Sequence, residues 1–336
     1  MIAIATAGPR RRAPSERTRS LVPVAVITAL VAALAPAGPG DPGVASVALV
    51  VGVVAVLGIP HGAVDHLVAL GAGSGEETPG GVLRFHLHYL AAMAGYGVLW
   101  LVAPGVALAA FLLASIHHFG QSDLAHLGLR QSRQLVLQWS RGLLLVGLPL
   151  VAHLAAVSPT IETLGGGDPA SWAWLTDHRE LWCALLVAQH VLVGAIVLIE
   201  LHDRRVMAMQ AATVALLAVL FVRTDPLVGF AVYFGLWHSL AHLRVLAHTL
   251  GGPPDDGGPM SPAQLLALAT PRSAPVLVGL GVLVAGAVVF DRVDLVVPTA
   301  LVVVSLVTPP HLVVVERLWR STARASGDAV TAIRPG

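Results

Sequence analysis

Apolar runs of about 20 residues recur along the whole length of this 336-residue chain. About 20 residues is the length at which a helix spans the hydrocarbon core of a bilayer. The composition agrees, because 56% of the residues are hydrophobic, only 12% are charged and the mean hydropathy is +0.79. The sequence therefore predicts an all-α fold, a polytopic transmembrane helical bundle.

The apolar runs and the residues that interrupt them predict about ten membrane spans. Their approximate ranges are 21–38, 44–68, 83–103, 105–121, 135–157, 181–201, 206–222, 226–249, 275–290 and 295–315. A multi-span membrane domain, in which any catalysis must occur, thus covers 21–320. It lies between an Arg-rich tail at 1–20 and a second tail at 321–336. Residues 158–180 are rich in turn formers and are expected to form an external loop.

Arginine placement predicts the orientation, since basic residues near span ends stay on the cytoplasmic side. The N-terminal tail carries five arginines and is expected to be cytoplasmic. Ten alternating spans then place residues 122–134 and 250–274, and both termini, in the cytoplasm of a multi-pass plasma-membrane protein. The Arg-rich start, a short apolar core and "ALAPAG" also resemble a cleavable signal peptide, whose removal would leave the remaining orientation unchanged.

Several functional classes are excluded by composition. A net charge of +1 and few aromatic residues argue against nucleic-acid binding. Cys183 is the only cysteine, so an intramolecular disulfide and a thiolate-cluster metal site are both ruled out. All 20 basic residues are Arg, and without a lysine amine the chain cannot itself hold retinal as a Schiff base.

Fifteen histidines are present, and many lie inside the predicted spans. Ionisable side chains at membrane depth are costly and usually face the bundle interior, so each is a functional candidate. The candidates occur in four motifs: "PHGAVDH" with His61, "SIHHFGQSD" with His117 and His118, "WHSLAH" with His238 and His242, and "TPPH" with His311. At a rise of 1.5 Å per residue, His61, His118, His238, His242 and His311 lie roughly 18 to 26 Å below the outer surface. They share one layer in the cytoplasmic half of the membrane.

Spacing within the motifs points to a metal. His238 and His242 are four residues apart, which stacks both imidazoles on one helix face. His61 and Asp65 have the same spacing, so Asp65 either accepts the other ring N–H of His61 or binds the metal itself. His66 is about 140° round the helix from His61 and is a poorer co-ligand. A histidine-rich site without thiolates is typical of oxygen-activating non-haem iron.

His311 and the neighbouring aromatic residues each have two interpretations. His311 follows "PP", where a break in the helix is expected. It either supports the metal site or only packs against neighbouring helices. Aromatic residues near the motifs either line a substrate tunnel or pack between helices; they include Phe119, Tyr233, Phe234 and Trp237.

The motifs "GIPHGAVDH", "IHHFGQSD", "FGLWHSLAHL" and "TPPHLVVVE" resemble, in order and spacing, the Brp/Blh family of bacterial and archaeal β-carotene 15,15′-dioxygenases. The resemblance runs from about residue 50 to 318. It implies an iron-dependent membrane oxidoreductase that cleaves β-carotene with O₂ into two all-trans-retinal, often for a microbial rhodopsin. The family's Fe²⁺-binding histidines map onto His61, His118, His238 and His242, with His117 as the alternative within the doubled pair. Asp65, His66, His117 and His311 are the expected supporting residues.

Two other classes use intramembrane histidines. Membrane di-iron desaturases and hydroxylases need about eight ligands in repeated boxes ending in paired histidines, whereas "HH" occurs once here. A metal or proton transporter would show related halves around a midplane site. The sequence has no such halves, and its histidines are expected away from the midplane.

Overall fold

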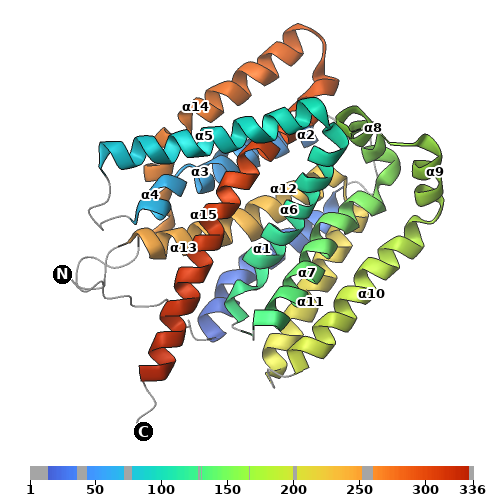
Figure 1. Cartoon of the computed structure of the whole chain (residues 1–336). Coiled ribbons are helices and arrows are strands. Elements are labelled where there is room, and N and C mark those ends of the chain that lie inside the picture. The colour runs from blue at the N-terminus through green and yellow to red at the C-terminus, as the bar shows by residue number, and fades with distance from the viewer. Residues whose placement is uncertain are drawn as a thin grey trace.

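A computed structural model describes residues 14–35, 44–71, 78–127, 129, 131–165, 167–199, 203–251 and 260–332. Helices make up almost all of this part of the chain, and no strand occurs in it. The predicted all-α bundle is confirmed (Figure 1). Residues 1–13 of the predicted N-terminal tail, 333–336 of the C-terminal tail and 252–259 of the 250–274 loop lie outside the described residues.

The helices follow one another with short connections. In chain order they are α1 Pro14–Leu34, α2 Val44–Val53, η1 Val54–Gly58, α3 Ile59–Gly62, α4 Asp65–Leu70, α5 Pro79–Val102, α6 Pro104–Leu124, η2 Ala125–Leu127, α7 Gln131–Ala152, α8 Leu154–Gly165, α9 Pro169–Asp177, α10 Arg179–Leu198, α11 Arg204–Arg223, α12 Pro226–Val232, η4 Tyr233–Ser239, α13 Leu240–Leu250, α14 Pro262–Val289, η6 Val293–Leu295 and α15 Val296–Ala332.

Seven helices of the described chain are long and apolar enough to cross a membrane. They span Ala48–Leu70, Pro79–Val102, Gln131–Ala152, Arg179–Leu198, Arg204–Arg223, Ala263–Val289 and Val296–Arg320. The protein is therefore a multi-span membrane protein. Two further predicted spans, 105–121 and 226–249, are also helical, but their histidines lower their mean hydropathy. In the remaining one, 21–38, the apolar helix covers only Leu21–Leu34.

Three local expectations are wrong. Residues 158–180 form most of α8 and all of α9 instead of a turn-rich loop. The side chain of Asp168 caps α9 by accepting from the backbone N–H of Ser171 at 3.1 Å, and Pro169 occupies its first turn, which is a standard helix start.

The second wrong expectation is a helix break before His311, because α15 continues through both prolines. Such prolines are tolerated in membrane helices. Finally, α14 begins thirteen residues before the span predicted at 275–290.

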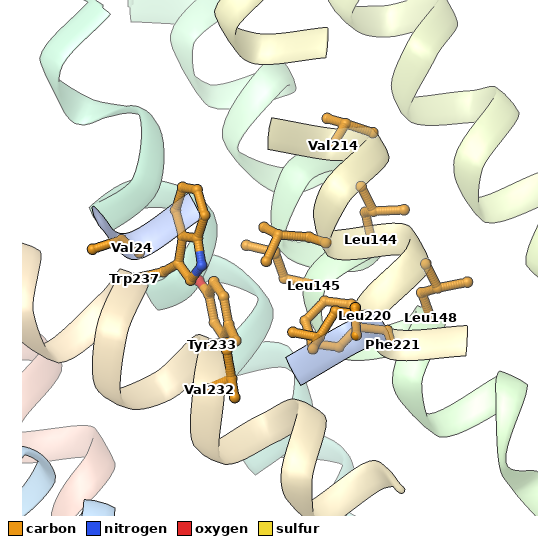
Figure 2. Packing of buried hydrophobic residues seen from close by; sticks show 12 residues of the cluster. Val24, Leu144, Leu145, Leu148, Val214, Leu220, Phe221, Val232, Tyr233 and Trp237 are labelled. Atoms are coloured by element: carbon orange, nitrogen blue, oxygen red, sulfur yellow. The ribbon is translucent and has the colours of Figure 1, made fainter. Parts of the chain in front are cut away.

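The larger apolar core joins α1, α7, α11, α12 and η4. Figure 2 shows side chains from these helices converging, with Trp237 beside Val24. The indole N–H of Trp237 donates to the buried hydroxyl of Thr28 at 3.0 Å. The first apolar helix is thus part of the bundle core.

A second apolar core joins α4, α13, α14 and α15 through residues such as Val64, Leu243 and Leu265. Helix α5 covers this side of the bundle but has no buried residue of its own. It is attached by hydrogen bonds from Tyr89, Tyr96 and Trp100, which recur along one face. The exposed Leu and Val side chains of α5 and α14 suit contact with lipid.

Helices α6 and α7 cross most closely. A Cβ atom on Gly120 would overlap the backbone carbonyl of Gln138, and one on Gly142 would overlap that of Ile116. Small residues at such crossings allow the backbones of membrane helices to approach. This crossing fixes the segment of α6 that carries His117 and His118.

Candidate metal centre

Two π-helical turns carry or precede histidines of the predicted site. The turn η1 leads directly into α3 and His61, whereas η4 contains His238. The two turns pack together with a glycine from each: a Cβ on Gly58 would lie 2.5 Å from Phe234 Cε1, and one on Gly235 would lie 2.5 Å from Val53 Cγ1. Single π-helical turns interrupt helices frequently at functional sites.

Five histidines meet where α3, α6, η4, α13 and α15 converge. The ring of His61 lies 5.4 Å from that of His238, 5.3 Å from that of His242 and 5.2 Å from that of His311, measured between centroids. The ring of His118 lies 4.8 Å from that of His238 and 5.2 Å from that of His311. We call His61, His118, His238, His242 and His311 the histidine centre. The five residues that the sequence places at one depth thus lie together in the structure.

The imidazoles of the histidine centre are buried, and most of their nitrogens have no hydrogen-bond partner. Its five residues are between 2% and 6% exposed. Both ring nitrogens of His238 and of His242, Nδ1 of His118 and Nε2 of His311 are buried without a hydrogen-bond partner. Buried polar groups are normally paired, because an unpaired one forfeits its interaction with water. So many unpaired nitrogens on neighbouring rings fit a site for a metal cation.

Asp65 has a different partner from the one expected. The chain bends at Ala63 and Val64, between α3 and α4, so His61 and Asp65 are not on one regular helix. Nδ1 of His61 instead lies 3.3 Å from the carbonyl of Leu57. Asp65 Oδ2 lies 2.8 Å from Nδ1 of His311 and accepts a hydrogen bond from Tyr89 at 3.2 Å.

The other two histidines of the motifs lie outside the centre. His117 is about 100° round its helix from His118; its Nε2 lies 3.8 Å from Oε2 of Glu316, and its ring lies against Trp139. His66 faces Phe85 and His86 of α5. The structure thus brings His118, and not His117, to the centre.

The four candidate lining residues divide into two pairs. Phe119 and Phe234 border the centre, with ring centroids 4.8 Å and 5.5 Å from that of His238. Tyr233 and Trp237 point the other way, into the apolar core of Figure 2. Helix η4 therefore carries histidine and phenylalanine on one side and core residues on the other.

A second buried polar group went unnoticed in the sequence. Arg141 of α7 is 1% exposed, although it lies within a predicted span. Its Nε lies 3.1 Å from Oδ2 of Asp123 on α6, and its Nη2 donates to Gln210 of α11. Nearby, Ser140 donates to Gln189 of α10 at 2.8 Å and contacts His190. We call these six residues the arginine cluster. An arginine in the middle of an apolar run was the available signal.

The donor set of the histidine centre suits a divalent transition metal. Single ligand atoms of His61, His118 and His311 all lie within 4.8 Å of one another, which makes them the one metal-capable group found among the described residues. Neutral imidazoles suit Fe, Zn, Cu and Ni. His238 and His242 are not members of this group, but their unpaired rings lie against those of His118 and His61.

The fold and the site together define the class of this protein: a multi-span helical membrane protein with a buried histidine centre. Comparison with protein families matches residues 52–319 to the β-carotene 15,15′-dioxygenase family, and the chain belongs to this family.

Two curated relatives align with part of the chain. A probable β-carotene 15,15′-dioxygenase Blh of Halobacterium salinarum is 29% identical over 201 residues, which is 56% of this chain and 58% of the relative. The β-carotene 15,15′-dioxygenase of an uncultured marine bacterium (66A03) is 26% identical over 195 residues, which is 55% of this chain and 64% of the relative. The alignments therefore span less than two thirds of either relative's length. No solved structure gives a significant match.

Proposed function

We propose that this protein is an enzyme that cleaves the central 15,15′ double bond of β-carotene with O₂. The carbon–carbon double bond and the O–O bond break, and two carbon–oxygen double bonds form. One β-carotene and one O₂ thus give two all-trans-retinal, with all atoms accounted for. The observation that carries the proposal is the buried histidine centre inside a membrane bundle of the β-carotene 15,15′-dioxygenase family.

The position of the histidine centre suits this substrate. β-Carotene is a hydrocarbon that dissolves in the bilayer, so a site within the bundle receives it from lipid. Phe119 and Phe234, which border the imidazoles, offer an apolar surface to the polyene. Burial of the histidines keeps water from the reacting carbons.

We further propose that the metal is Fe²⁺ and that His61, His118, His238 and His242 hold it. When bound, Fe²⁺ supplies the redox chemistry that cleavage by O₂ requires. The protein positions the imidazoles: His238 and His242 come from consecutive turns with their rings nearly parallel at 12°, and His61 and His118 come from two other helices. Asp65 contributes to the site by orienting His311, whose Nδ1 lies 2.8 Å from Oδ2 of Asp65.

Release of the product follows from the sequence. Because the chain lacks lysine, retinal cannot remain on it as a Schiff base. We propose that retinal leaves into the lipid or to another protein such as a microbial rhodopsin.

The alternative functions have less support. A di-iron oxidase needs a second set of ligands, whereas the described residues contain one metal-capable group. A histidine-lined transporter needs a polar path through the bundle. Apolar side chains flank the histidine centre instead, with Phe234 and Phe119 on one side and Val64 and Leu243 nearby.

For the membrane arrangement, we propose ten crossings of the plasma membrane with both termini cytoplasmic. Besides the seven apolar helices, α1, α6 and the continuous run α12–η4–α13 would cross. In a Cys183→Ser background, Ser132→Cys and Met260→Cys should react with an impermeant thiol reagent only after the cytoplasmic side is opened. Labelling of either position in intact cells would contradict this orientation.

The reaction itself is tested with anaerobically purified protein. We expect about one iron per chain, and incubation with β-carotene and O₂ should give retinal at close to two molecules per carotene consumed. Cells that make β-carotene should lose their orange colour when they express the protein. They should stay coloured with His61→Ala or His118→Ala. A product mixture dominated by unequal fragments would contradict central cleavage.

A further inference from the structure

The structure assigns His311 a direct role: we propose that its Nε2 is a fifth imidazole ligand of the metal, and that Asp65, held by Tyr89, orients it. This inference rests on the proposed metal centre, and it extends the ligand set beyond His61, His118, His238 and His242.

His311 occupies the position of a ligand. Its side chain comes from α15, about 250 residues along the chain from α3, yet its ring centroid lies 5.2 Å from those of His61 and His118 and 5.7 Å from that of His242. It belongs to the group whose ligand atoms all lie within 4.8 Å of one another. A histidine that only packed between helices would not need to share this point with four other imidazoles.

The two ring nitrogens of His311 have separate surroundings. Nδ1 lies 2.8 Å from the carboxylate of Asp65, whereas Nε2 is buried with no hydrogen-bond partner. With a proton on Nδ1 donated to Asp65, Nε2 keeps its lone pair free. A carboxylate that accepts the second N–H is the usual companion of a metal-bound histidine, because it fixes the ring and raises its basicity.

Asp65 is itself fixed in place. It is 3% exposed, and Oδ2 accepts from Tyr89 of α5 as well as contacting His311. Both interactions of Oδ2 are thus with protein groups, which fits an orienting role better than ligation. The contacts from Tyr89 to Asp65 and from Asp65 to His311 thus link the lipid-facing helix α5 to the histidine centre.

The test measures binding of Co²⁺, a spectroscopic substitute for Fe²⁺, to purified protein in detergent, by visible absorption and by competition with a chelator. His311→Ala should change the visible spectrum and weaken binding by more than the roughly 10- to 100-fold that loss of an orienting partner costs. Asp65→Asn should fall within that range, and Tyr89→Phe should have a smaller effect. Added imidazole should restore the wild-type spectrum to His311→Gly.

The matched control is His190→Ala. His190 is equally buried but is paired with Ser140 outside the histidine centre, so Co²⁺ binding should stay at the wild-type level. Wild-type spectrum and affinity in a folded His311→Ala protein would overturn the inference, as would failure of imidazole to change the His311→Gly spectrum. Product analysis of the wild-type iron protein is a separate measurement: metal binding without retinal formation contradicts the proposed reaction and leaves the ligand assignment standing.

Discussion

The histidine centre and the arginine cluster are both buried polar groups, and α6 contributes to both through His118 and Asp123. In the arginine cluster, most groups have a protein partner: Arg141 forms an ion pair with Asp123 and donates through Nη2 to Gln210, and Ser140 contacts Gln189 and His190, while Nη1 of Arg141 has no hydrogen-bond partner. In the histidine centre, most ring nitrogens have none. The difference indicates that the arginine cluster joins helices, whereas the histidine centre has the free donors of a metal site.

Replacing His238 by Leu should give the largest effect on function. The substitution removes a donor whose two nitrogens have no protein partner, so iron content and retinal formation should fall to background while the metal-free protein stays as stable as the wild type. Iron analysis, product chromatography and thermal unfolding of metal-free protein measure this. A large loss of metal-free stability would show that His238 holds helices together, as in the arginine cluster.

Replacing Arg141 by Leu should instead lower the stability of the folded protein. Arg141→Leu removes the guanidinium that lies 3.1 Å from the Asp123 carboxylate; breaking a fully buried ion pair costs about 3–5 kcal/mol, and the cost here should be at or below that range because the Asp123 side chain is 18% exposed. Thermal unfolding in detergent should show the loss. The double variant Arg141→Leu with Asp123→Leu should recover much of it, because no uncompensated charge remains. Equal stability of the single and double variants would contradict the pairing.

Gly120→Ala should disturb both regions by a smaller amount. The new Cβ would overlap the carbonyl of Gln138 and force α6 away from α7, at a cost of about 1–3 kcal/mol. Because His118 is two residues away, iron content should also fall. Gly194→Ala on α10 is the matched control: its Cβ meets nothing within 4 Å, so stability should be unchanged or slightly higher.

Thr28→Val should have the smallest effect. It removes the acceptor for the indole of Trp237, a neighbour of His238, and should cost roughly 1 kcal/mol of stability with normal iron content. The control is Thr249→Val, since the exposed Thr249 hydroxyl bonds only to its own helix at Val245. A loss of iron in Thr28→Val would show that α1 positions the histidine centre directly.

Much of the site could be predicted because membrane helices are regular. With a fixed rise per residue, the sequence places His61, His118, His238, His242 and His311 at one depth, and the structure brings them together. Contacts between helices were not accessible in this way. The partner of Asp65 is 246 residues away, and the bend after α3 directs its carboxylate to it.

The sequence by itself determined the class of fold and pointed to the histidines that meet, because hydrophobic length and helical rise act along the chain. Tertiary structure decided which nitrogens converge and which polar groups are paired. It placed His118 against His238 but His117 near Glu316. It also brought Asp65 to His311 and Asp123 to Arg141. These outcomes depend on the rotation and crossing of helices, which are set by close-packed contacts such as Gly120 against Gln138 and Gly58 against Phe234.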